Sequence, residues 1–264
     1  MPKCRLCLQS EDLIKNSHII PDFMYQDLYD ENHKMIMTAG LDVASARKMQ
    51  TGEKEGGILC RRCDNETLGS LEGYANRVLF TGKEKIRVQN VLHPDGILTS
   101  TLCENLDYTK FKLFLLSILW RSSISKRPFF SNVQLGPIEE DIRKMIFENM
   151  PLEQMDFPCL VSSWRHTQRR MTSSVITSPR RIRGENGGTR YIFQIGQLVL
   201  MFFVSKHDRP EWLHDASITP ENKMRIVHFG NEQGKDLMEG LFGPLWVEAL
   251  SMAYEDKKES PPKS

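Results

Sequence analysis

Two Cys-x-x-Cys pairs constrain this chain more than any other feature. Cys4 and Cys7 form the first pair and Cys60 and Cys63 the second, with residues 8 to 59 between them. Each pair places two sulfur atoms on one tight turn, which supplies half of the tetrahedral shell that Zn²⁺ prefers. The four cysteines therefore predict a closed, structural zinc site that joins two segments far apart in the sequence.

A redox dithiol is the alternative reading of these cysteines, but a redox motif is typically a single pair near a βαβ pattern. The chain starts MPKCRLCLQS and shows no apolar run of a secretory signal. We therefore expect a reducing, cytoplasmic location, where Cys103 and Cys159 are small core residues.

The composition is that of a soluble globular protein, with 40% apolar and 26% charged residues among 264. That length allows one large domain or two modest ones. The most apolar stretch, residues 191–205, is interrupted by Gln194 and Gln197 and is shorter than the about 20 apolar residues that span a bilayer. We interpret it as buried sheet and expect no membrane partner.

The chain divides at about residue 80 into two predicted domains of an α+β protein. In residues 1–80, Leu68, Leu71 and Ala75 recur at helical spacing after the second cysteine pair, so this pair lies at a helix N-terminus. Asp64 or Asn65 is expected to cap that helix.

Residues 81–264 are expected to form an α+β domain with an antiparallel sheet. Residues 81–107 have the composition of a strand-poor connector. Residues 108–121 are apolar almost all round, which indicates a helix buried on every side. We also expect a helix that begins at Gly136-Pro137 and ends at Pro151, and an antiparallel sheet of three or more strands within 157–205. In the C-terminal part, a helix is expected to start at Thr219-Pro220-Glu221 and a last helix to cover about 235–255. Residues 257–264 are expected to be a disordered end.

A second motif lies between the cysteine pairs. Residues 17–21 read Ser-His-Ile-Ile-Pro, and residues 59–65 read Leu-Cys-Arg-Arg-Cys-Asp-Asn and lead into the predicted helix. With the first Cys-x-x-Cys pair, this combination resembles the zinc-containing HNH, or His-Me finger, endonucleases over residues 4 to about 75.

The resemblance implies a zinc-bound treble-clef or ββα-metal finger in residues 1–80. It also implies cleavage of nucleic-acid phosphodiester bonds, with His18 as the general base and with Asp64 and Asn65 at the site of a catalytic Mg²⁺ or Mn²⁺. A neutral imidazole can take a proton from water near pH 7, and a divalent cation neutralises charge on the phosphate. By family-level analogy, such a protein serves as an anti-phage or mobile-element effector.

A non-enzymatic reading remains open, because Ser17 occupies a position where the family often has a metal ligand. In this reading Ser17 and His18 support the zinc knuckle, and Asp64 and Asn65 only cap the helix. The protein would then be a zinc-stabilised interaction or nucleic-acid-binding protein.

An arginine-rich segment supplies a candidate nucleic-acid surface. Between residues 165 and 190 the only acid is Glu185. Arginine makes two-pronged contacts with phosphate, so this segment predicts salt-sensitive nucleic-acid binding. The alternative is a solvated hairpin whose arginines pair with acids elsewhere. A protein partner bound through the C-terminal domain is a separate expectation. The candidate residues are Arg165, Arg169, Arg170, Arg180, Arg181 and Arg183.

Overall fold

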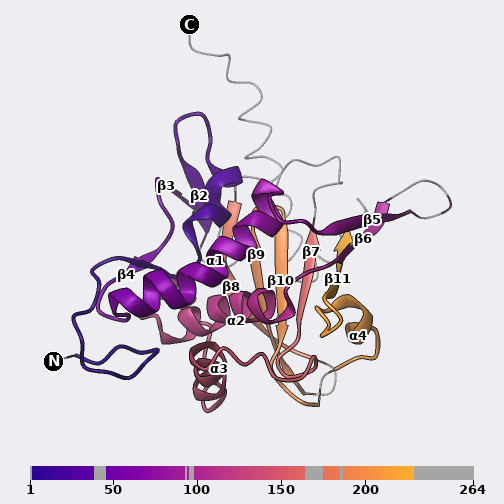
Figure 1. The fold of residues 1–264 in the computed structure, drawn as a ribbon. Helices are drawn as coiled ribbons and strands as arrows, with labels where there is room; N and C mark the ends of the chain where they lie inside the picture. Colours follow the sequence, from indigo (N-terminus) through magenta and orange to yellow (C-terminus); the bar gives the residue numbers. More distant parts are fainter. Residues whose placement is uncertain are drawn as a thin grey trace, which may run out of the picture.

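The computed structural model describes residues 2–38, 46–92, 94, 98–163, 175–184, 187–207 and 209–228. These residues form an α+β fold in which helices pack on a mixed sheet (Figure 1). The α+β class is therefore confirmed. The strands are β1 (Ser17–His18), β2 (Met35–Thr38), β3 (Arg47–Met49), β4 (Lys54–Glu55), β5 (Arg87–Leu92), β6 (Leu98–Glu104), β7 (Cys159–Ser163), β8 (Val175–Arg183), β9 (Thr189–Ile195), β10 (Leu198–Phe203) and β11 (Lys223–His228).

The main sheet is mixed rather than purely antiparallel. Within the described residues its order is β3-β2-β8-β9-β10-β7-β11-β6-β5, and β1 and β4 form a separate two-stranded ladder. The β2–β8 and β7–β11 pairs are parallel, and the other neighbours are antiparallel. Both parallel pairs join strands from distant parts of the sequence, which local patterning does not reveal.

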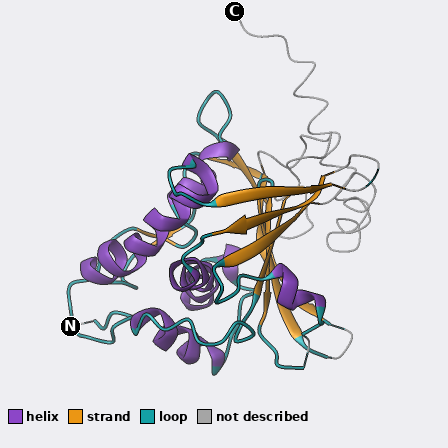
Figure 2. Cartoon of the chain, turned by 45° about the vertical axis from the view of Figure 1, so that its right-hand side comes forward, coloured by secondary structure: helices purple, strands orange, loops and turns teal. Residues whose placement is uncertain are grey.

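Helices lie on both faces of the sheet (Figure 2). Helices α1 (Gly69–Asn76), α2 (Tyr108–Ile124) and α3 (Ile138–Phe147) lie on one side. The short helix α4 (Trp212–Ala216) lies on the other side, where Leu213 packs with Leu160 and Phe203 in a small second core.

Helix α2 is the centre of the main core and confirms the prediction for residues 108–121. It begins after Asp107, whose side chain accepts a hydrogen bond of 2.9 Å from the Lys110 N–H. Nearly every residue of the helix is buried, including Phe114 and Trp120. The predicted second helix is also present as α3, which ends at Phe147, before Pro151.

The finger helix, as we call residues 61–81, follows directly from the second cysteine pair. It contains wide π turns at Cys63–Leu68 and Arg77–Thr81 on either side of α1, and it ends at Gly82 with φ of 61°. Asp64 and Asn65 therefore lie inside the helix, so the prediction that one of them caps it is wrong.

Two further expectations need correction, and a third is confirmed. The connector at 81–107 contains the β5–β6 hairpin, whose outer strand carries mostly exposed residues and so lacks a buried alternation. The apolar stretch 191–205 is buried sheet, as predicted, and consists of two strands, because Gly196, with φ of 58°, turns the chain between β9 and β10. Thr219 pairs with Lys223 in a turn that enters β11, so no helix starts there. The expectations for 235–255 and 257–264 lie outside the described residues.

Strands from both sides of residue 80 share the main sheet. β2 and β3 come from the N-terminal segment and extend the sheet beyond β8. Residues of both segments, such as Leu6 and Leu116, belong to one hydrophobic core. The division into domains 1–80 and 81–264 stays a prediction.

No helix within the described part of the chain combines the length and the apolar character needed to cross a membrane.

Candidate metal centre and the His18 strand

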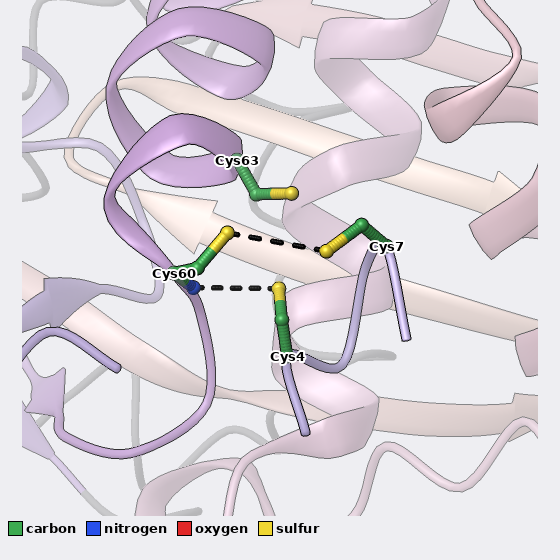
Figure 3. Close-up of side chains that lie close together, drawn as sticks. All are labelled: Cys4, Cys7, Cys60 and Cys63. Atoms are coloured by element: carbon green, nitrogen blue, oxygen red, sulfur yellow. Dashed lines mark hydrogen bonds between the residues drawn. The ribbon is translucent and has the colours of Figure 1, made fainter. Parts of the chain in front are cut away.

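Figure 3 shows the four cysteines of the N-terminal pairs gathered around one point. All four side chains are buried, and their sulfur atoms lie within 4.8 Å of one another. The sulfur atoms of Cys7 and Cys60 are 3.9 Å apart, and the Cys60 N–H donates a hydrogen bond of 3.3 Å to the sulfur of Cys4. The cluster can thus hold a structural metal ion such as zinc, as the sequence predicts.

The electrostatics of the cluster differ among the four cysteines. Burial raises the pKa of Cys60 to about 11 and raises the pKa of Cys63 as well. For Cys4, burial also opposes ionisation, but the backbone N–H groups of Cys7 and Cys60 outweigh it and hold the pKa below its ordinary value. Four thiolates in this space therefore require a positive ion among them.

A buried arginine of α3 holds the first cysteine turn. Arg143 donates through Nη1 to the carbonyl oxygen of Leu6 at 2.5 Å, and its other nitrogens bind Glu140 at 2.7 and 2.8 Å. Arg5, in the same turn, pairs with Glu139 of α3 at 3.1 Å. The cysteine cluster is thus fastened to the helical layer as well as to the finger helix.

His18 lies on β1, which pairs antiparallel with β4 in the register His18 opposite Lys54. Its ring nitrogen Nε2 is 3.2 Å from Oδ1 of Asp22, although among the described residues no group makes an aligned hydrogen bond to this nitrogen. The two groups are therefore close enough for an ion pair, while the ring is 25% exposed and Asp22 is 61% exposed.

Burial lowers the pKa of the His18 imidazole below its ordinary value of 6.5. The carboxylate of Asp22 acts in the opposite direction, and the positive charges of Lys54 and Arg121 lower the pKa further. The imidazole is therefore mostly neutral at pH 7 and able to accept a proton.

Ser17, the neighbour of His18 on β1, connects this strand to the finger helix. Its hydroxyl donates a hydrogen bond of 2.6 Å to Oδ1 of Asp64. The Asp64 carboxylate also contributes to the electrostatic environment of His18. Asn65 is exposed on the same helix. The structure thus brings His18 and Asp64 to one place.

Sequence reasoning missed Arg121, the most buried cation at this site. Its side chain is 1% exposed and donates through Nη1 to the His18 carbonyl oxygen at 2.9 Å and to Glu72 Oε1 at 2.6 Å. Two further bonds reach Ser117 of α2. The missed clue was an arginine inside an apolar helix, which needs a buried acceptor.

The end of α2 also binds β4. Glu55 is buried and accepts hydrogen bonds from the Ser125 hydroxyl at 2.6 Å and from the Lys126 N–H at 2.9 Å. Both strands of the small ladder, β1 through Arg121 and β4 through Glu55, are therefore fixed to α2.

Two further side chains of a type that can bind metal, Glu72 and His33, make other contacts. Glu72 is engaged by Arg121. His33 is exposed and stacks on Tyr29, with ring centroids 4.0 Å apart.

The arginine-rich segment is described only in part. Arg181 and Arg183 are exposed on β8, and Arg180, directly before them, is half-buried, where burial lowers its pKa. Because side chains alternate along a strand, Arg181 and Arg183 share a face that Arg180 does not. Arg165, Arg169 and Arg170 lie outside the described residues.

Comparisons with known proteins give no match: no family model, no curated protein and no solved structure corresponds to this chain.

Proposed function

We propose that this protein is a metal-dependent endonuclease of the HNH, or His-Me finger, type. The observation that carries the proposal is the order of elements around His18. A short strand bearing His18 pairs with β4, and the finger helix bearing Asp64 follows directly. In the proposal these elements are the ββα arrangement of the family. The four-cysteine cluster is its treble-clef zinc site.

His18 is the general base of the proposed reaction. Its lowered pKa keeps the imidazole neutral, and the proximity of Asp22 to Nε2 leaves Nδ1 to take the proton of the attacking water. Asp64, held by Ser17, and Asn65 on the same helix are the groups that would bind one Mg²⁺ or Mn²⁺. That cation supplies charge neutralisation at the scissile phosphate.

The substrate in this proposal is a nucleic acid. The exposed guanidinium groups of Arg181 and Arg183 support it, because arginine pairs well with backbone phosphates. Arg165, Arg169 and Arg170 remain predicted contacts of the same substrate. An anti-phage or mobile-element role is a further part of the proposal.

A plasmid-nicking assay tests the reaction. Wild-type protein is incubated with supercoiled DNA and Mg²⁺ or Mn²⁺, beside single-stranded RNA, and compared with His18→Ala and the control His33→Ala. Loss of a general base should lower the rate by a factor of about 10²–10⁴, while the exposed His33 should be dispensable. Equal cleavage by wild type and His18→Ala, or no cleavage of either substrate by wild type, would sink the proposal.

A second candidate, a non-catalytic zinc-stabilised interaction or nucleic-acid-binding protein, is favoured by a specific observation. The Asp64 carboxylate is already engaged by Ser17 at 2.6 Å, and the His18 carbonyl by Arg121 at 2.9 Å. In this reading Asp64 joins the finger helix to β1, and Arg121 fastens β1 to α2. A folded His18→Ala protein would then keep its binding function, whereas Cys60→Ser would lose its fold.

A further inference from the structure

A cavity of about 530 Å³ lies between the C-terminal end of the finger helix and the main sheet. Val78, Leu79 and Phe80 form the wall on the helix side. The sheet side comes from β5, β6 and β11 and from the turn between β9 and β10. A volume of this size is within the range of roughly 300–1,000 Å³ that small-molecule sites occupy.

The walls of this cavity are mainly apolar, and some of their side chains stay partly exposed. Val78, Leu79, Phe80 and Ile226 are all of intermediate exposure, although each packs against the main core. Covering partly exposed apolar side chains with an apolar molecule removes their surface from water, which favours binding.

One end of the cavity is polar. The Thr101 hydroxyl donates to Oδ1 of Asn90 at 3.1 Å, and its oxygen is 2.7 Å from Nε2 of His228. Because the hydroxyl has a single hydrogen, His228 must be the donor in the second bond, so Nε2 carries the proton. Asn90, Thr101 and His228 therefore form an ordered chain of hydrogen bonds at the cavity wall.

The described lining residues offer an anion no lysine or arginine partner. None of the described lining residues is Lys or Arg, and Asp27 is the acid among them. A carboxylate or phosphate placed here would lose its hydration without gaining a cationic partner.

We propose that this cavity is a binding site for an uncharged, amphipathic small molecule, with a flat apolar body against Val78, Phe80 and Ile226 and one hydrogen-bonding group toward Asn90 and Thr101. The site is separate from the His18 and cysteine sites and does not depend on the proposed nuclease activity.

Three probes with related skeletons test the chemical class. N-phenyl-1-naphthylamine is uncharged and carries one N–H, 1-phenylnaphthalene lacks that N–H, and 8-anilinonaphthalene-1-sulfonate adds a negative charge. Fluorescence titration of the full-length protein should show saturable, one-to-one binding of the amine. The hydrocarbon, measured by competition, should bind about 2- to 10-fold more weakly. The sulfonate should bind more weakly than both.

Two filling variants test the location. Val78→Trp and Leu79→Trp place an indole in the cavity and should weaken binding of the amine by about tenfold or more. Ser70→Trp adds the same group at an exposed position on the same helix and should bind as wild type does. Circular dichroism and metal content establish that each variant is folded.

Several results would overturn the assignment. These are absence of saturable amine binding to wild type, equal binding by both folded filling variants, or binding of the sulfonate as tight as that of the amine. None of them bears on DNA nicking, so this inference and the proposed function fail independently.

Discussion

Among single residues, His18 and Arg121 set the chemistry at the β1 strand. Burial lowers the pKa of the His18 imidazole. Arg121 donates a hydrogen bond of 2.9 Å from Nη1 to the carbonyl oxygen of the same residue. One group is therefore placed to accept a proton, while the other restricts the backbone that carries it.

The depressed pKa of His18 leads to a prediction about the pH dependence of nicking. A base is active when deprotonated, so the acidic limb of the pH–rate profile should have its midpoint below pH 6.5, the ordinary value for histidine. Asp22→Asn removes a carboxylate that raises this pKa, and the midpoint should therefore move further toward acid.

The measurement is the nicking rate of both proteins across a pH series at constant cation concentration. Asp30→Asn, in the loop after the same segment, serves as a control that should leave the midpoint in place. A midpoint above 6.5, or one that rises in Asp22→Asn, would contradict the assignment of His18 as the base.

Between elements, the Arg121–Glu72 pair joins α2 to the finger helix. Arg121→Met leaves a partly buried carboxylate without its cation, so the free energy of unfolding should fall by about 3–5 kcal/mol. The free energy of unfolding should fall less in the double variant Arg121→Met/Glu72→Leu than the sum of the decreases in the two single variants, because the partners are coupled. Chemical denaturation of the four proteins measures this.

Arg127→Met is the matched control. Arg127 also bonds the small ladder, through the Lys54 carbonyl oxygen at 2.7 Å, but its side chain is 49% exposed. The substitution Arg127→Met should lower the free energy of unfolding by roughly 1 kcal/mol or less. Equal costs for Arg121→Met and Arg127→Met would show that the buried pair does not hold the two elements together.

Elements with a strong local pattern were predictable from the sequence. The apolar run that forms α2 and the face of Ile142 and Ile146 in α3 identify buried helices. The β5–β6 hairpin was not predictable, because the outer strand β5 is largely exposed and lacks an apolar alternation. Thr219-Pro220 looked like a helix start, but pairing of β11 with β6 and β7 overrides that local preference.

At the candidate site, the ligands were predictable but their support was not. The spacing predicts that each pair forms one turn, and the four-ligand preference of zinc predicts that the two pairs meet, as they do. The bond from Ser17 to Asp64 and those from Arg121 to His18 and Glu72 join residues 47 or more positions apart, and no local pattern encodes such contacts.

For the whole molecule, the cysteine cluster and the main sheet should unfold together. The segment between the cysteine pairs contributes β2 and β3 to the sheet, and Arg143 ties the first cysteine turn to α3. We therefore expect Cys60→Ser to lower the stability of the entire described fold, in a single transition followed alike by near-UV and far-UV circular dichroism. Cys103→Ala should keep both metal and cooperativity. Two separate transitions in the wild type would contradict this coupling.

Metal analysis of the purified protein tests whether the four cysteines hold one structural zinc ion. Elemental analysis should give one zinc per chain, retained in Cys103→Ala and lost in Cys60→Ser. Because thiolates must lose the metal as they protonate, zinc release should accompany acidification and unfolding. A wild-type protein that folds without bound metal, or a Cys60→Ser protein that keeps a full equivalent of zinc, would contradict the account.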